Sequence, residues 1–349
     1  MTSGLDCYPG NLYPPPMADF NYNGRTLTIN GVRWSPQDGE AAGGQSSRGP
    51  HRLEAGLKCD RKTYLRYLMK RGRLLSTVKD KIPLIGTALH ARAADYHTRQ
   101  LPHWPRWLTE MTLEERVLLD CEGHPEAQGI SDLSKSMWKA CEAQTAPGDI
   151  LVPHSVEREV WAPLSELDPD CPPSLRDEVV TARLDLIAIQ HKGPYKDQLV
   201  VWDYKTTGGF KKKGSNSVSL PHWDPKNPWW SMHYQGALAL ALTRARFGLP
   251  VAGFFIIRVT REAPHVIDRQ MLNIPPALIA QAGRLATYAV QHELRLKERL
   301  ASGQEVLPTG AMTGVCGDFS GCEYLALCQA PSKTIEKSLI KNDYFWQKS

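Results

Sequence analysis

An aspartate and a lysine two residues apart lie at the end of an apolar stretch in the middle of the chain. The stretch, residues 199–207, reads LVVWDYKTT and is typical of a buried strand that becomes polar at its end. Because side chains alternate along a strand, Asp203 and Lys205 share one face while Trp202 and Tyr204 share the other. A buried acid and base are costly unless they pair, bind a metal ion or stay solvated. Taken alone, this pair fits a structural ion pair better than a catalytic site.

A second acid, Asp185, interrupts the preceding apolar stretch, residues 179–189. The polar segment between the two stretches suits an antiparallel connection, so Asp185 and Asp203 would meet at one edge of a sheet. Two carboxylates a few ångströms apart repel, and a hard divalent cation such as Mg²⁺ or Mn²⁺ relieves this repulsion. His90, on a predicted helix, would add a nitrogen ligand, and Lys205 would orient a water or neutralise charge on a phosphate.

Three motifs, GTALH, ARLDLI and VWDYKTT, contain these residues in chain order. Their arrangement resembles the PD-(D/E)XK nuclease superfamily, and within it the RecB-like branch of the CRISPR-associated exonucleases and their phage relatives. The resemblance implies a restriction-endonuclease-like fold, a set of metal ligands and a lysine that assists the attacking water. The implied ligands are His90, Asp185, Asp203 and the main-chain carbonyl of Tyr204, and the implied lysine is Lys205.

Further positions are compared through the same resemblance. In the RecB-like branch a helix with a glutamine follows the third motif, and Gln235 in HYQGALA is the matching catalytic residue. The family often has a tyrosine four residues later, where this chain has Ala239. Some relatives carry an extra acid on the first strand, where Glu157 and Glu159 lie, but a solvated face explains these two residues equally well.

Three cysteines, Cys316, Cys322 and Cys328, lie within thirteen positions near the end of the chain. Such clustering without a visible secretory signal favours metal ligation over buried free thiols, and Cys59 is the best upstream candidate for a fourth ligand. Four thiolates suit either zinc or an iron–sulfur cluster. The resemblance implies a [4Fe–4S] cluster that joins the two ends of the nuclease domain, with zinc as the alternative. Asp60 replaces the family's usual proline, and the first downstream gap is five residues instead of two.

A run of three lysines, Lys211, Lys212 and Lys213, follows the Asp-x-Lys strand in a glycine-flanked loop. Trp223, Trp229 and Trp230 lie further along the chain. Lysines and aromatic rings together suit phosphate contacts and base stacking, so DNA, as ends or single strands, is the expected partner. A solvated lysine run with core tryptophans is the alternative, and the position of the run beside the proposed metal site favours DNA.

The periodicity of the apolar residues predicts the elements that must position these side chains. The expected helices cover 53–71, 86–99, 112–121, 131–144, 231–247 and 275–300, and the expected strands cover 156–161, 179–189, 198–206, 251–260 and 265–269. The core order of a helix, three strands, a helix and a strand predicts an α/β (α+β) fold.

The chain is expected to hold one decorated nuclease domain. Residues 1–52 are rich in Pro, Gly, Ser and Asn, which is typical of an irregular arm, with a short hairpin expected around residues 25–34. The nuclease domain is expected over 53–330, with a helical insertion at about 105–148, a cysteine segment at 310–330 and a tail at 331–349.

Composition sets broad limits. The chain has 349 residues, of which 42% are hydrophobic, and a formal net charge of +5. This length allows one large domain or two, and the mild positive charge is compatible with a polyanion partner without demanding one. No run of about 18 apolar residues occurs, so no membrane span is expected, and a cytoplasmic location is predicted.

The sequence favours a metal-dependent DNA nuclease, an exonuclease that acts on DNA ends in recombination, repair or phage DNA processing, or with a CRISPR partner protein. The alternative from a different class is a non-catalytic DNA-binding or assembly factor that uses the nuclease fold as a scaffold. A zinc-binding protein with an unrelated α/β domain would require the motif order to be accidental. Catalysis is favoured because all four core positions are present: His90, Asp185, Asp203 and Lys205.

Overall fold

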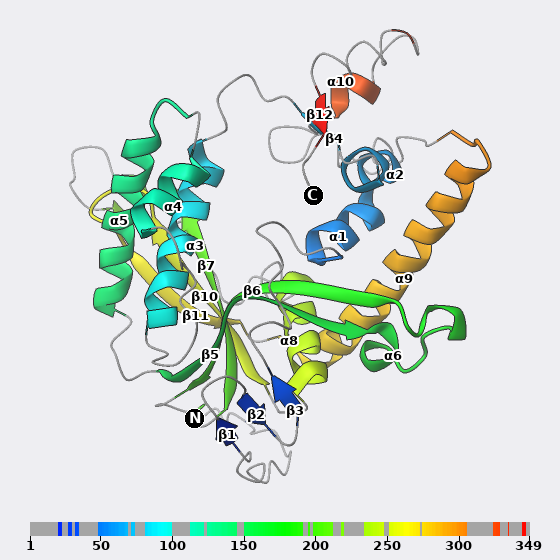
Figure 1. The fold of residues 1–349 in the computed structure, drawn as a ribbon, viewed down its shortest axis with the longest axis horizontal. Helices are drawn as coiled ribbons and strands as arrows, with labels where there is room; N and C mark the ends of the chain where they lie inside the picture. Colours follow the sequence, from blue (N-terminus) through cyan, green and yellow to red (C-terminus); the bar gives the residue numbers. More distant parts are fainter. Residues whose placement is uncertain are drawn as a thin grey trace, which may run out of the picture.

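Five strands form an open mixed sheet in the computed structural model (Figure 1). They are β5 (Ile150–Pro163), β6 (Val179–Gln190), β7 (Leu199–Thr207), β10 (Val251–Thr260) and β11 (Ile267–Leu272). Their order across the sheet is β11-β10-β7-β6-β5. Strands β5, β6 and β7 pair antiparallel, β7 and β10 pair parallel, and β10 and β11 form an antiparallel pair at the edge. The predicted mixed α/β fold is confirmed.

The structure describes most of the chain between residues 48 and 305 and short segments outside that range. The described residues are 20–22, 27–29, 32–34, 48–68, 71–73, 81–99, 112–121, 124–144, 150–190, 195, 198–211, 218–219, 234–247, 251–272, 274–305, 324–328, 334 and 344–346. Within the expected N-terminal arm, β1 (Phe20–Tyr22), β2 (Leu27–Ile29) and β3 (Val32–Trp34) form a small antiparallel sheet, and β2 and β3 are the predicted hairpin.

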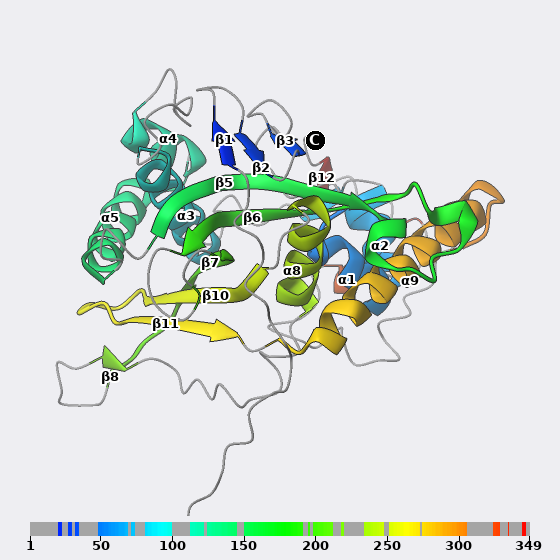
Figure 2. The ribbon, with the colours of Figure 1, turned by 90° about the horizontal axis from the view of Figure 1, so that it is seen from below.

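Helices cover both faces of the central sheet, as the view from below shows (Figure 2). On one face lie α3 (Lys81–Arg99), α4 (Leu113–Asp120) and α5 (Ala127–Gln144). On the other face lie α8 (Tyr234–Phe247), α9 (Pro276–Ala301) and α1 (Pro50–Lys58). Two short helices, α6 (Leu164–Leu167) and η3 (Pro173–Leu175), connect β5 to β6, and a small hairpin of β8 (Phe210–Lys211) and β9 (Val218–Ser219) follows β7.

The alternation along β7 divides the core into two parts. Trp202 and Tyr204 are fully buried among residues of α3 and α5. Val201 is fully buried among residues of α8 and α9. The strand is apolar on both faces because helices cover both faces, which is the usual reason for a continuous apolar strand. The period of two therefore separates Asp203 and Lys205 from the aromatic side chains, as predicted.

The single helix predicted over 53–71 is wrong, because the chain breaks at Cys59. Helix α1 ends at Lys58, and Cys59 has an extended backbone with φ −160° and ψ 117°. The chain then continues as α2 (Asp60–Thr63) and a π-helical turn, η2 (Tyr64–Leu68). The Cys59 carbonyl begins the second helix by accepting bonds from the Thr63 amide and hydroxyl, both at 3.0 Å. Apolar residues keep their spacing across this break, so periodicity alone does not reveal it.

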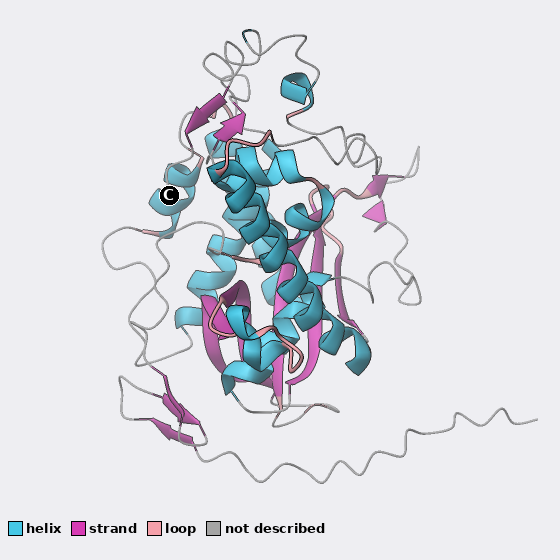
Figure 3. Cartoon of the chain, turned by 90° about the vertical axis from the view of Figure 1, so that its right-hand side faces the viewer, coloured by secondary structure: helices cyan, strands magenta, loops and turns pink. Residues whose placement is uncertain are grey.

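Segments that are distant in sequence meet beside α2. Strand β12 (Tyr344–Trp346) pairs antiparallel with β4 (Arg71–Arg73), so part of the expected tail is a strand. The short helix α10 (Leu325–Cys328) packs here as well, because Tyr324 and Leu327 are buried with Leu65. Figure 3 shows the β4–β12 pair apart from the central sheet.

Candidate active site

The central sheet opens where β6 and β7 separate. The two strands pair only over Leu186–Ile189 of β6, and Asp185 and Asp203 are the first residues beyond the last pair. At this point the backbone amide of Tyr204 donates to Asp185 Oδ2 at 2.7 Å. A carboxylate of β6 thus takes the place of a backbone carbonyl as the acceptor. The fork brings Asp185 and Asp203 to neighbouring positions.

His90 of α3 faces two carboxylates at this fork. Its Nδ1 lies 3.2 Å from Asp185 Oδ1 and 3.5 Å from Glu157 Oε1 of β5. The second oxygen of each carboxylate is held by a protein donor: Asp185 Oδ2 by the Tyr204 amide, and Glu157 Oε2 by Arg183 Nε at 3.1 Å. One oxygen of each acid therefore remains directed at the imidazole.

This arrangement of donors fits a divalent cation. Ligand atoms of His90, Glu157 and Asp185 all lie within 4.8 Å of one another. Adjacent ligands of an octahedral Mg²⁺, with bonds of about 2.1 Å, lie roughly 3 Å apart, close to the two distances measured from His90. Imidazole nitrogen and carboxylate oxygen also suit Mn²⁺. These three residues could therefore bind a divalent cation; His90 and Asp185 belong to the ligand set implied by the sequence, and Glu157 does not.

Asp203 and Lys205 form an ion pair beside this three-residue cluster. Lys205 Nζ lies 2.9 Å from both carboxylate oxygens of Asp203 and donates a hydrogen bond to Oδ1. Asp203 Oδ2 is buried and, among the described residues, makes no hydrogen bond of acceptable geometry. Its ion pair with Lys205 offsets part of the cost of burying this oxygen, and a metal ion could use the lone pair that no hydrogen bond occupies.

The charges at the fork shift three pKa values. Burial lowers the pKa of His90, but the charge of Asp185 and the hydrogen bonds to Asp185 and Glu157 outweigh burial and raise that pKa well above 6.5. Burial raises the pKa of Asp203. Burial lowers the pKa of Lys205, but the charges of Asp203 and Asp185 outweigh it and raise that pKa. The fork thus favours bound positive charge, as a proton or as a metal ion that would displace the proton.

A buried hydrogen bond joins α3 to β7 on the face of β7 opposite Asp203. His97, two helical turns after His90, places Nε2 2.7 Å from Tyr204 Oη. Trp138 and Tyr96 surround the pair, with ring centroids 5.2–6.2 Å from the imidazole. Burial lowers the pKa of His97 to about 3, so its imidazole is neutral at physiological pH. Tyr204 therefore contacts α3 through its hydroxyl and Asp185 through its amide.

Glu157 is the cluster residue that sequence reasoning did not select. Its backbone has φ +48°, in the left-handed region that glutamate rarely adopts. The only sequence signal was an acid on the first strand, and that signal does not distinguish Glu157 from Glu159. The left-handed conformation depends on tertiary contacts, so the sequence could not reveal it.

The remaining predicted site residues are placed only in part. Gln235 lies half-buried in the first turn of α8. Lys211 is in β8, but its side chain, with Lys212 and Lys213, lies outside the described residues. Among the four cysteines, Cys59 is buried and Cys328 is half-buried, while Cys316 and Cys322 lie outside the described residues. The roles of these residues stay predictions.

The sequence matches the family model of the PD-(D/E)XK nuclease superfamily over residues 49–329, so the chain belongs to this superfamily. The open mixed sheet with helices on both faces is its restriction-endonuclease-like fold. Membership supports a nuclease function.

Solved structures add little to this assignment. A protein from Eubacterium rectale, provisionally assigned as an exonuclease, is 12% identical, with a TM-score of 0.38 over 69% of this chain and 74% of that one. No curated protein matches the sequence. Within the described residues no helix is both long and apolar enough to cross a lipid bilayer.

Proposed function

We propose that the protein is a metal-dependent DNA nuclease of the RecB-like branch that acts on DNA ends as an exonuclease. The observation that carries this proposal is the set of His90, Glu157 and Asp185 ligand atoms within 4.8 Å of one another, beside the Asp203–Lys205 pair. A structural ion pair does not require two carboxylates facing one imidazole with a third carboxylate nearby. The surplus of carboxylates is explained by a cation that they bind together.

The proposed metal is Mg²⁺ or Mn²⁺. His90, Glu157 and Asp185 would hold it, and Asp203 and the main-chain carbonyl of Tyr204 are proposed as further ligands. A bound ion of this kind lowers the pKa of a water and neutralises charge on the phosphodiester.

Lys205 is proposed to act as a charged donor. Its side chain is 37% exposed, so it is accessible to substrate, while Asp203 holds its amine at 2.9 Å. The charges of Asp203 and Asp185 outweigh burial and raise its pKa, so the amine is protonated at neutral pH without a bound metal. The ammonium group would orient the attacking water or stabilise negative charge on the phosphate.

DNA is the proposed partner, contacted in part by Lys211, Lys212 and Lys213, with Gln235 assisting catalysis. The proposed setting is recombination, repair or phage DNA processing, or an association with a CRISPR protein. A non-catalytic scaffold is the second candidate, because a carboxylate–lysine fork can also persist in a protein that only binds DNA.

The test is degradation of end-labelled linear duplex and single-stranded DNA with Mg²⁺ or Mn²⁺, and with EDTA. Circular DNA separates end-dependent from internal cleavage. We expect Asp203→Asn and Lys205→Met to lower the rate by about 10²–10⁴-fold, the range for loss of a proton-transfer or positioning group. Asp170→Asn, which changes an aspartate that is 79% exposed, is the matched control and should retain the rate.

Two outcomes contradict the proposal. Cleavage that survives EDTA or both active-site variants would exclude the metal mechanism. Retention of DNA by the wild-type protein without any cleavage would favour the scaffold.

We also propose that Cys59, Cys316, Cys322 and Cys328 hold a [4Fe–4S] cluster, with zinc as the alternative. The packing of Tyr324 and Leu327 against Leu65 supports this proposal, because it brings the helix of Cys328 beside the segment that follows Cys59. Analysis of anaerobically purified protein for iron, sulfide and zinc is the test. About four irons and four sulfides per chain are expected for this cluster. Stoichiometric zinc without sulfide would replace it with a zinc site, and the absence of both would leave free thiols.

A further inference from the structure

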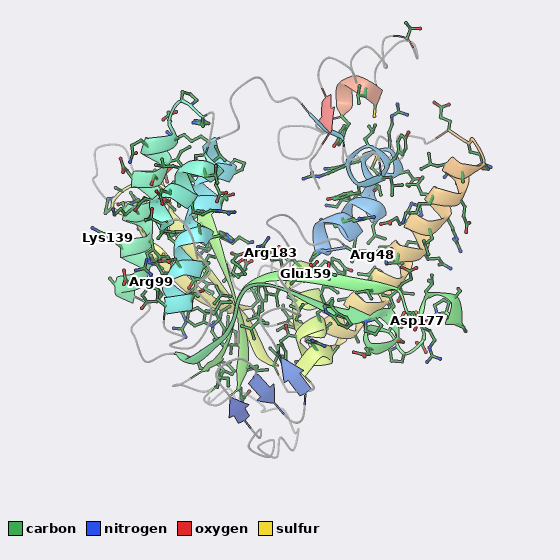
Figure 4. The ribbon with its side chains drawn as sticks, in the orientation of Figure 1. Arg48, Arg99, Lys139, Glu159, Asp177 and Arg183 are labelled. Atoms are coloured by element: carbon green, nitrogen blue, oxygen red, sulfur yellow. The ribbon has the colours of Figure 1, made fainter. Side chains whose placement is uncertain are left out.

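Arg183 contacts two parts of Glu157 with one nitrogen. Its Nε lies 3.1 Å from the carboxylate oxygen Oε2 and donates to the main-chain carbonyl of the same residue at 3.3 Å. The direct cross-strand neighbour of Arg183 in the β5–β6 ladder is Glu159, not Glu157. The guanidinium therefore reaches one position further along the face of β5. Figure 4 shows Arg183 on β6 near the middle of the molecule, with Glu159 beside it.

The backbone of Glu157 needs such support. A non-glycine residue with φ +48° is strained and persists only where surrounding contacts hold it. Arg183 Nε binds both ends of this residue, the carbonyl and the carboxylate. Relaxation of Glu157 to an ordinary strand conformation would break this double contact.

The same contact sets which oxygen of Glu157 faces the cluster. Arg183 holds Oε2, and Oε1 lies 3.5 Å from His90 Nδ1. Asp185 repeats this pattern, because the Tyr204 amide holds Oδ2 and Oδ1 lies 3.2 Å from His90 Nδ1. Each acid thus has one oxygen held by a fixed donor and one oxygen presented to the imidazole. Donors of this kind, behind the ligands of a metal, orient them and tune affinity.

We propose that Arg183 is a positioning residue that holds Glu157 in its left-handed conformation and directs Oε1 to the metal site. This inference rests on the proposed function, because it assigns a role toward the metal. A partly exposed ion pair adds little stability, so the contribution of Arg183 is geometric. The side chains of Arg183 and Glu157 are 23% and 12% exposed, so both are partly buried.

The test is Mn²⁺ affinity measured by isothermal titration calorimetry without DNA, on the full chain. We expect Arg183→Lys and Arg183→Gln to raise the Kd for Mn²⁺ by about 10–100-fold, as loss of a ligand-orienting donor does. Arg183→Lys keeps the charge but lacks the Nε that makes both contacts. Equal losses of Mn²⁺ affinity in the two variants would therefore show that the geometry of the Arg183 contacts matters and its charge does not. Glu159→Gln changes the direct cross-strand neighbour and should leave the Kd unchanged.

A double-variant cycle shows whether Arg183 acts through Glu157. In a Glu157→Gln background, where the ligand is already lost, Arg183→Gln should weaken Mn²⁺ binding no further. Thermal unfolding of each variant shows whether the variant still folds. The Kd for Mn²⁺ is calculated from the concentration of folded protein, so it stays constant if Arg183 only stabilises the fold.

The outcomes distinguish this inference from the proposed function. If wild-type protein binds Mn²⁺ and the Arg183 variants bind it equally well or more tightly, the proposed role of Arg183 is wrong. The proposed metal site is not affected by this outcome. Additive losses in the cycle would overturn action through Glu157. Wild-type protein that binds no Mn²⁺ would overturn both.

Discussion

Helix α3 carries two polar clusters two residues apart. Residues at this spacing do not face each other on a helix, so His90 and Arg92 project to different neighbours. His90 meets Glu157 and Asp185 at the fork of the sheet. Arg92 meets Glu114 and residues of α5 within the helical insertion. The two clusters share a helix and partly buried charge, and they differ in how completely the charge is matched.

The Arg92 cluster is satisfied. The guanidinium is 3% exposed and binds both oxygens of Glu114 at 3.0 and 2.8 Å. Its other contacts are the hydroxyl of Ser134 at 2.9 Å and the hydroxyl and carbonyl of Ser131 at 3.0 and 3.1 Å. Such a cluster needs no further ligand, so we interpret it as a device that joins α3, α4 and α5.

The His90 cluster is not satisfied. Two carboxylates face one imidazole, the neighbouring Asp203 keeps a buried oxygen without a hydrogen bond among the described residues, and Glu157 has a left-handed backbone. Charge imbalance, a buried oxygen without a hydrogen bond and local strain at one place are typical of a functional site. Both clusters contain buried charge. The structural Arg92 cluster and the His90 site differ in how completely each charged group is matched by partners, and this difference distinguishes their roles.

The largest expected effect on stability is in the satisfied cluster. Glu114→Gln leaves the buried Arg92 without its counter-charge, and we expect the free energy of unfolding at pH 7 to fall by about 2 kcal/mol. This figure is below the value for a fully buried pair because Glu114 is 45% exposed. Urea unfolding measures the loss. Metal affinity of the folded protein should not change, and an equal loss of both would contradict the separation of the clusters.

A smaller effect of the same substitution appears at acid pH. Hydrogen bonding to Arg92 lowers the pKa of Glu114 from 4.5 to about 2. Because the folded-state pKa is depressed, the ion pair stabilises the protein above about pH 4.5, and this contribution is lost as the pH falls towards 2. The unfolding free energies of wild type and Glu114→Gln should therefore converge over this interval. Parallel curves would show that Glu114 does not carry the shift.

Much of the fold follows from apolar periodicity. The predicted strand over 179–189 is β6, and the predicted strand over 198–206 is β7, each within one residue at its ends. The period of two also predicted which residues share a face of β7, because helices cover both faces and every position has a defined side. The break at Cys59 was missed because backbone hydrogen bonds, and not apolar spacing, produce it.

The candidate site was predictable where its residues belong to recognisable sequence motifs. Asp203, Lys205, Asp185 and His90 came from motifs, and the structure brings them to one fork. The parts that the sequence could not supply are contacts between strands. Glu157 joins the cluster through an unusual backbone conformation, and Arg183 holds it from a neighbouring strand.

The most direct test of this comparison is stabilisation by Mn²⁺ in three proteins: wild type, Asp185→Asn and Glu114→Gln. Metal that binds only the folded state adds about 2.7 kcal/mol at 100 times its Kd, which thermal unfolding detects. We expect Mn²⁺ to stabilise wild type and Glu114→Gln equally and to leave Asp185→Asn unchanged. Equal stabilisation of Asp185→Asn, or none of the wild type, would contradict the assignment of the unsatisfied cluster as the metal site.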